Sequence, residues 1–227
     1  SEARVACETL ATTNRIVLAG EVRASKDNMP SIMDQIEAEV RNAISDIGYE
    51  QDKFHHAHFE FQNYLHEQSA DIAAGVDSSD SKEEGAGDQG LMFGYACGET
   101  EELMPAPIHY AHQLLKGMAA LRKKNTDSIL GPDAKSQITL RYADDGSIEG
   151  VETLVVSTQH KEGVSESDIR ALITPLAADL LPDGWMVGAK NFLINPTGNF
   201  VIGGPGGDAG LTGRKIIVDT YGGAAPH

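Results

Sequence analysis

The sequence predicts an α+β fold built from repeated strand–strand–helix units, with mixed or antiparallel sheets. Short apolar runs come in pairs joined by turns, and one amphipathic helix follows each pair. Strands and helices do not alternate one by one, as they do in a doubly wound parallel sheet. Residues 4–47 and 136–181 share the order strand, strand, helix, so we expect a repeat that is visible in element order although it is weak in sequence.

The first unit begins with two apolar runs, residues 4–10 and 16–22, whose polar connection predicts a β-hairpin. Each run contains one glutamate, Glu8 or Glu21. Helical spacing then predicts a helix from Ser31 to Gly48, and its apolar stripe is Ile32, Ile36, Val40, Ile44 and Ile47. Alternation predicts a strand over residues 54–65, and the polar composition of residues 68–84 predicts a surface loop.

The second unit is preceded by a predicted helix that Pro107 opens and that ends near Asn125. An Asp-Asp-Gly turn at residues 144–146 joins predicted strands over residues 136–142 and 148–160. The S-x-x-D pattern of Ser165 and Asp168 predicts the start of a helix that reaches about Leu181. Residues 191–195 and 200–202 are predicted to form another hairpin, and residues 215–221 a last strand.

Charge and cysteine content exclude several classes of function. The 227 residues include 34 acidic and 18 basic side chains, and the net charge of −16 would repel a nucleic-acid backbone or an anionic membrane. No apolar run approaches the roughly 20 residues of a membrane helix, and the first residues have no signal-peptide profile. Cys7 and Cys97 are too few for a disulfide framework. We therefore expect a soluble cytoplasmic protein without a nucleic-acid or membrane partner.

Two glycine-rich segments are candidate ligand sites. In residues 84–90 the glycines let the backbone approach a ligand, and Asp88 can accept a hydrogen bond from an amine or a ribose hydroxyl; a solvated turn is the alternative. In residues 203–215 the exposed N–H groups, with Arg214 and Lys215, suit a phosphate. A flexible loop with solvated cations remains open there, because neither standard nucleotide fingerprint is present.

Two further groups of polar side chains are candidate ligand or metal sites. Asp133 and Lys135 stand two residues apart at the start of a strand, where Lys135 can meet a phosphate oxygen while Asp133 stays near a metal or base; an exposed ion pair is the alternative. His56 and His58 would share a strand face, but no third metal ligand follows at a recognised spacing. No nucleophile elbow or Ser-His-Asp arrangement is visible.

Six stretches together are similar to one known family, the S-adenosylmethionine synthetases (methionine adenosyltransferases), in order and at compatible spacing. They are GAGDQGLMFGYA (85–96), LMPAPI (103–108), DAKSQ (133–137), STQH (157–160), NPTG (195–198) and GDAGLTGRKIIVDTYGG (207–223). The similarity runs along the whole chain. It implies that the chain makes S-adenosylmethionine from ATP and L-methionine with release of phosphate and pyrophosphate, using Mg²⁺ and K⁺. It also implies a homodimer or tetramer whose sheets form the interface and whose active sites lie between subunits.

The resemblance also assigns roles residue by residue. It implies that Glu8 resembles the K⁺-site glutamate, and that Asp71 belongs to a mobile loop over the site. The methionine-side residues it implies are Glu21, Gln68, Asp88 and Asp208. The ATP-side residues it implies are Asp133, Lys135, Ser157, Phe200, Arg214 and Lys215. Among all of these, Lys135, Arg214 and Asp208 are the expected catalytic residues.

The resemblance further predicts three domains: residues 1–80 of the N-terminal type, residues 84–203 of the central type, and residues 204–227 as the start of the third. A G-H-P-D-K segment and a later lysine- and aspartate-containing segment of the family have no counterpart here, so we expect a truncated member with reduced activity. Ala70 and Asn199 stand where the family usually has proline and arginine. The alternative function is a non-catalytic dimerising paralogue or a regulatory subunit of a full-length synthetase.

Overall fold

A computed structural model describes residues 3–25, 29–69, 83, 85–86, 88–125, 127–188 and 190–227. The chain forms two compact units, each with its own sheet. Unit 1 comprises residues 1–92 and 205–214, and unit 2 comprises residues 93–204 and 215–227. Antiparallel and parallel strand pairs occur in both units, which confirms the predicted α+β class with mixed sheets. The three predicted domain boundaries stay a prediction.

Unit 1 is built on the predicted hairpin. Strands β1 (Arg4–Thr12) and β2 (Arg15–Arg23) pair antiparallel along their whole length, and Asn14 adopts a positive φ of 48° in the turn between them. Strand β5 (Glu60–Glu67) lies parallel to β2, and the short β9 (Gly210–Leu211) lies antiparallel to β1. The strand order is therefore β5-β2-β1-β9.

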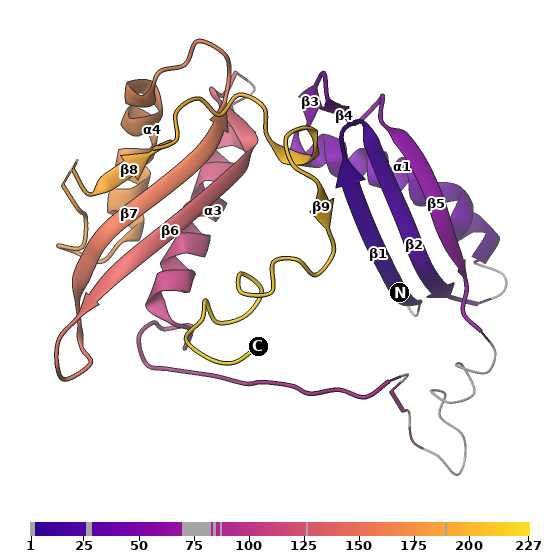
Figure 1. Cartoon of the computed structure of the whole chain (residues 1–227), viewed down its shortest axis with the longest axis horizontal. Helices are drawn as coiled ribbons and strands as arrows, with labels where there is room; N and C mark the ends of the chain where they lie inside the picture. Colours follow the sequence, from indigo (N-terminus) through magenta and orange to yellow (C-terminus); the bar gives the residue numbers. More distant parts are fainter. Residues whose placement is uncertain are drawn as a thin grey trace. The chain divides into compact units, whose positions relative to one another are not determined.

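Helix α1 (Met29–Ile47) covers one face of this sheet (Figure 1). Three members of its predicted stripe, Ile36, Val40 and Ile44, pack against the buried core of unit 1. That core consists of Ile16, Leu18, Phe54 and Phe59. No residue of the helix itself is fully buried, so α1 lies on the sheet as a half-exposed layer.

The predicted strand over residues 54–65 is wrong in its first half. Two short strands, β3 (Glu50–Gln51) and β4 (Phe54–His55), pair with each other, and a turn follows before β5 begins. The turn forms because the N–H groups of His58 and Phe59 donate to the carbonyl of His55, and Ala57 N–H donates to the His55 ring at 3.1 Å. Phe54 and Phe59 therefore both reach the core, which strict alternation would have prevented.

Unit 2 repeats the same order with a longer hairpin. Its elements are α3 (Ala106–Lys124), β6 (Leu130–Tyr142), β7 (Ile148–His160), α4 (Glu166–Leu180) and β8 (Phe192–Ile194). Strands β6 and β7 are antiparallel, and β8 lies parallel to β7. The predicted capping box is confirmed, because Asp168 N–H donates to the Ser165 hydroxyl while Ser165 N–H donates to the Asp168 carboxylate.

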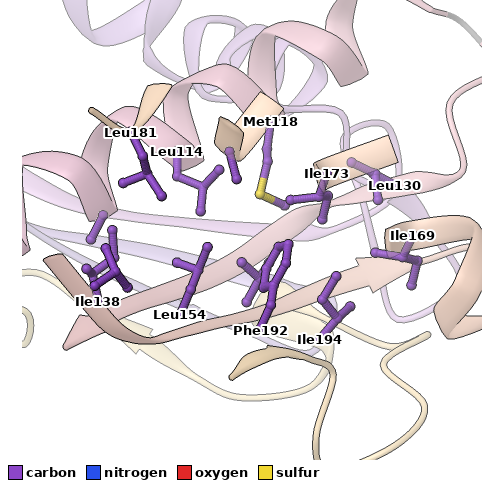
Figure 2. Close-up of a cluster of buried hydrophobic side chains, with 14 residues drawn as sticks. Leu114, Met118, Leu130, Ile138, Leu154, Ile169, Ile173, Leu181, Phe192 and Ile194 are labelled. Atoms are coloured by element: carbon purple, nitrogen blue, oxygen red, sulfur yellow. The ribbon is translucent and has the colours of Figure 1, made fainter. Parts of the chain in front are cut away.

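The core of unit 2 lies between its sheet and two helices, α3 and α4 (Figures 1 and 2). Alternate residues of the hairpin, including Ile138, Leu154 and Val156, face these helices. Leu154, Val156 and Ile173 are fully buried, with 0% exposure. Figure 2 shows Phe192 of β8 among Leu154, Ile169 and Ile194, so the third strand closes one side of the core.

Two predicted strands are wrong. Residues 200–202 form no strand, because β8 pairs with β7 and the Asn195–Gly198 turn leads the chain away from it. A short 3₁₀ helix, η1 (Gly204–Gly206), follows. Residues 215–221 form turns in which Asp219 N–H donates to the Lys215 carbonyl, although Ile216, Ile217 and Val218 favour strands. Among the described residues they pair with no strand, so local hydrogen bonds determine their conformation.

Candidate functional site

Unit 1 places two of the predicted acidic residues on the face of its sheet that α1 does not cover. In the antiparallel register Glu8 lies opposite Ala19, and Glu21 lies opposite Ala6. Residues opposite each other share a face, so the two glutamates are diagonal neighbours on this face. The adjoining residues of the other face, Ile16 and Leu18, belong to the core. We call the uncovered side the open face of unit 1.

Gly20 sets the local geometry next to Glu21. Its φ of +134° is rarely adopted by other residues, and a Cβ there would come within 2.0 Å of the Ala6 carbonyl oxygen. A side chain at residue 20 would therefore force β2 away from β1. The glycine keeps the two strands close where the hairpin carries its carboxylates.

The open face of unit 1 also carries ionisable partners from β5. Glu21 lies opposite His66 in the parallel register, and its Oε1 is 3.6 Å from His66 Nε2. At the other end of the face, Arg15 donates two hydrogen bonds to Glu60. These bonds, with one from Gln62, lower the pKa of Glu60 below its ordinary value. The face is thus polar at both ends. His66 was not predicted, because only the parallel pairing of β5 brings it to Glu21.

Gln68 follows β5 directly, and its N–H donates to the Val22 carbonyl at 3.3 Å. Its side-chain Oε1 is buried, and among the residues that the structure describes no donor forms a hydrogen bond with it. A buried amide oxygen without a donor costs free energy, so this atom is suited to accept a hydrogen bond from a ligand. Asp71, predicted beside it, lies outside the described residues.

Unit 2 brings together two ATP-side candidates on its own open face, the side of its sheet away from α3 and α4. Lys135 of β6 lies directly opposite Ser157 of β7, and both alternate with core-facing neighbours. The Lys135 side chain is exposed, and Ser157 is half-buried. An ammonium and a hydroxyl are therefore available side by side to a polar ligand.

Asp133 and Phe200 lie at the same end of this sheet but have structural partners. Asp133 Oδ2 accepts a hydrogen bond from Gly204 N–H at 2.8 Å. The backbone of Phe200 pairs with His160, the last residue of β7. The alternative of an Asp133–Lys135 ion pair is not found among the described contacts. Asp133 instead connects β6 to the segment that follows Phe200.

The remaining candidates are exposed and lie outside strands and helices. They are Asp88, Asp208, Arg214 and Lys215. Asp88 accepts a hydrogen bond from the N–H of the next residue, Gln89, at 2.7 Å. Within the described part of the chain no hydrogen bond or ion pair joins these four side chains to another candidate.

The histidines of residues 55–58 do not form a chelating group. The rings of His55 and His56 stack with centroids 4.6 Å apart, and His58 lies 4.7 Å from His55. Stacked rings present faces to one another, so their nitrogens do not converge on one point. Across the described residues, no three His, Cys, Asp or Glu side chains gather closely enough to hold a metal ion.

Comparison with known proteins decides which family has this combination of folds. Three family models match in sequence order: the N-terminal domain of S-adenosylmethionine synthetase over residues 1–70, the central domain over residues 83–200 and the C-terminal domain over residues 202–227. The chain belongs to the S-adenosylmethionine synthetase family. The resemblance of the six sequence stretches to this family is thereby confirmed.

Curated relatives are similar over the whole chain. The S-adenosylmethionine synthase of Roseobacter denitrificans is 62% identical over 228 residues, which is 100% of this chain and 58% of that protein. Those of Jannaschia sp. and Maricaulis maris are 60% and 62% identical, with 58% and 57% of their length covered. The chain thus spans less than two thirds of the length of the synthases it matches.

The ions that the family resemblance implies fit the described residues unequally. Mg²⁺ and K⁺ prefer oxygen ligands, and Glu8 offers one exposed carboxylate of the right kind for K⁺. For Mg²⁺, no three His, Cys, Asp or Glu side chains of the described residues converge, so protein ligands would have to be supplemented by phosphate oxygens or water. In those same residues, no helix combines the length and apolar character that crossing a bilayer requires.

Proposed function

We propose that the chain acts in methionine adenosyl transfer, forming S-adenosylmethionine from ATP and L-methionine with release of phosphate and pyrophosphate. The observation that carries the proposal is the contrast between the two open faces. Carboxylates, Glu8 and Glu21, lie on one hairpin, and an ammonium with a hydroxyl, Lys135 and Ser157, lies on the other. These are complementary to the ammonium of an amino acid and to the phosphates of a nucleotide.

The methionine side of the proposal is supported by unit 1. Glu21 and the buried Oε1 of Gln68 are acceptors that suit the three N–H donors of a substrate ammonium. Asp88 and Asp208 are further acceptors on exposed segments, and we assign them to the same substrate. The thioether of methionine is neutral, so its binding needs orientation more than charge.

The reaction itself requires stabilisation of a leaving group. The methionine sulfur donates its lone pair to C5′ of ATP, forming a C–S bond, and the bond from C5′ to oxygen breaks. The departing tripolyphosphate carries about four negative charges, so cationic groups placed along it lower the barrier. We assign this role to Lys135, Arg214 and Lys215. Asp133, Ser157 and Phe200 are assigned to binding of the nucleotide. Asp208 is, with Lys135 and Arg214, one of the three expected catalytic residues. Water then splits the tripolyphosphate.

Mg²⁺ and K⁺ are part of the proposal only as ions that neutralise phosphate charge when bound, with Glu8 as a K⁺ ligand. A homodimer or tetramer is the proposed assembly, with active sites shared between subunits. The open face of unit 1 supports it, because the cross-strand neighbours Leu10 and Leu211 are 37% and 46% exposed there. A cytoplasmic location fits Cys7 and Cys97, which are both free thiols.

Product formation by the purified chain tests the proposal. At millimolar ATP and methionine, mass spectrometry should detect S-adenosylmethionine, and Lys135→Met should lower the rate about 100-fold or more because one leaving-group contact is lost. Lys161→Met, which removes an exposed lysine just beyond β7, should stay within about twofold of the unmodified chain. An equal rate in Lys135→Met would contradict the assignment.

The same measurements distinguish the alternative functions. Binding of both substrates without product would favour the non-catalytic paralogue, and hetero-oligomers with a full-length synthetase would identify a regulatory subunit.

A further inference from the structure

The strongest unassigned feature is a buried pair of polar side chains at the end of β7, Gln159 and His160. They are 6% and 5% exposed, respectively, and polar groups this deeply buried are normally hydrogen-bonded for a structural or functional reason. Neither belongs to the proposed substrate contacts. Both belong to the STQH stretch, whose last two residues the proposed function leaves without a role.

Gln159 bridges two segments that carry candidate ATP-side residues. Its Oε1 accepts a hydrogen bond from Asp133 N–H at 3.4 Å, and its Nε2 donates to the Val201 carbonyl at 2.9 Å. Asp133 in turn accepts from Gly204 N–H. Three hydrogen bonds therefore form a closed set between β6, β7 and residues 201–204.

The Gln159 side chain packs against two glycines, Gly131 and Gly203, and fills the space that a Cβ at either residue would occupy. A Cβ at Gly131 would lie 2.6 Å from Gln159 Cγ, and a Cβ at Gly203 would lie 2.8 Å from Gln159 Oε1. Contacts below 3.0 Å require a shift, so larger residues at either place would displace the amide. The packing is thus specific to a glutamine between two glycines.

His160 holds the neighbouring residue of the same segment. Its N–H donates to the Phe200 carbonyl at 2.9 Å, and its ring Nε2 accepts from Phe200 N–H at 3.1 Å. The ring Nδ1 lies 2.9 Å from the Lys161 carbonyl, so Nδ1 carries the proton and Nε2 is free to accept. The ring thus holds Phe200 through Nε2, while the contact of Nδ1 with the Lys161 carbonyl orients the ring.

We propose that Gln159 and His160 are positioning residues that hold Asp133 and residues 200–204 in the geometry needed to bind the nucleotide. The inference rests on the proposed function in so far as Asp133 and Phe200 are its ATP-side residues. The pair acts through these two residues and has no substrate contact of its own. Gln159 thereby holds Asp133 and Val201, and the adjacent His160 holds Phe200.

Four variants separate the contributions. Gln159→Met keeps the length of the side chain and removes both hydrogen bonds, and His160→Leu removes the ring acceptor. His160→Gln retains an acceptor at a similar reach and should restore the hydrogen bond from Phe200 N–H. Gly203→Ala disturbs the same contact from the opposite side, since its Cβ would meet the Gln159 amide. Gln113→Met in α3 is the matched control, because it makes the same chemical change at a half-buried glutamine elsewhere in unit 2.

Amide hydrogen exchange is the readout that needs no ligand. In Gln159→Met, His160→Leu and Gly203→Ala, exchange at Phe200 and Gly204 should accelerate about tenfold or more, because loss of about 1.4 kcal/mol of local stability corresponds to that factor. His160→Gln and Gln113→Met should exchange like the unmodified chain. Unchanged exchange in Gln159→Met and His160→Leu would overturn the inference. Trp185 fluorescence identifies any variant that fails to fold, in which case Gly203→Ala decides.

Titration calorimetry with ATP and with methionine is the second readout. The destabilised variants should raise the Kd for ATP about tenfold and leave the Kd for methionine within about twofold, a split that general unfolding would not produce. Faster exchange with an unchanged Kd for ATP would overturn the positioning role. If the unmodified chain binds no ATP, the proposed function fails, and exchange alone decides whether Gln159 and His160 hold the segment.

Discussion

The two units share one chain order but differ in how they are stabilised. Each has an antiparallel hairpin, then a helix, then a strand parallel to the second hairpin strand: β1, β2, α1, β5 in unit 1 and β6, β7, α4, β8 in unit 2. Among the described residues, four buried ones form the core cluster of unit 1, and fourteen form that of unit 2. The larger core of unit 2 comes partly from α3, which has no counterpart among the described elements of unit 1.

The open faces of the two units differ in the polar side chains that they carry. On both faces the candidate site residues lie at or next to cross-strand pairs of the hairpin. These pairs are Glu8 and Ala19 in unit 1 and Lys135 and Ser157 in unit 2. The face of unit 1 carries Glu8 and Glu21 within its hairpin, whereas the face of unit 2 carries Lys135 beside Ser157. The helix-covered face therefore determines stability, whereas the open face is free to vary in charge. The following predictions test this division of roles, beginning with the largest effect.

Truncation of the most enclosed aromatic of unit 2 should have the largest effect on stability. Phe192→Ala removes a side chain that is 2% exposed and packs in the core of fourteen buried residues. The expected loss is about 3–5 kcal/mol, because a cavity adds to the lost burial. Chemical denaturation followed by the fluorescence of the single tryptophan, Trp185, measures it. Leu193→Ala, on the open face of the same strand, should cost less than about 1 kcal/mol. Equal losses would show that the two faces do not differ.

Exchange of one charge on each open face should separate the two substrates. Glu21→Gln should raise the Kd for methionine about tenfold because a charge-assisted hydrogen bond becomes a neutral one, and should leave the Kd for ATP within about twofold. Lys135→Met should show the reverse pattern. Titration calorimetry measures both constants. Glu67→Gln, at the exposed end of β5, is the control for loss of a carboxylate. If both variants weaken both substrates equally, the faces have no separate roles.

Sequence patterns predicted the parts of this comparison that depend on local chemistry. The alternation and turns gave both hairpins, and S-x-x-D gave the capping box at Ser165. The patterns did not predict partners. Residues 215–221 favour a strand but have no strand to pair with in the described chain, and the turn after His55 replaced an apparent alternation.

The site residues followed the same rule. Glu8 and Glu21 were conspicuous as carboxylates inside apolar runs, but their shared face depends on register. The sequence marked Gln159 and His160 only as the last two residues of the STQH stretch. Their partners Val201 and Phe200 lie 42 and 40 residues away, a distance over which no periodicity carries information. A glutamine and a histidine directly after the apolar residues 154–156 of a predicted strand were the available signal.

Loss of a helix cap should have a smaller effect that again belongs to the helix-covered side. Ser165→Ala removes the hydroxyl that accepts Asp168 N–H at the start of α4. The free energy of unfolding should fall by about 1 kcal/mol, as is typical of an N-cap serine. Thermal and chemical denaturation check the value. Ser45→Ala, at an exposed serine of α1, is the control for loss of a hydroxyl and should change it by less than about 0.5 kcal/mol.

The smallest effect concerns Tyr142, at the end of β6, whose hydroxyl lies 3.3 Å from both carboxylate oxygens of Glu99. Burial and the negative charge of Glu99 raise the pKa of Tyr142 from 10.0 to about 12. Because the folded state favours the neutral phenol, its contribution to stability is fully present below pH 10 and is lost as the pH rises through about 12.

Absorbance titration of the phenolate should therefore show late ionisation that Tyr142→Phe removes, and Glu99→Gln should shift that ionisation to lower pH. Tyr110 also has a raised pKa, through burial and the charges of Glu102 and Glu101, so its late ionisation should remain in Tyr142→Phe. Stability should fall less steeply above pH 10 in Tyr142→Phe than in the unmodified chain. Since Glu99 also accepts the N–H of Ala106 at the start of α3, an unaltered titration in Glu99→Gln would mean that this carboxylate serves the helix alone and leaves the hairpin end independent of it.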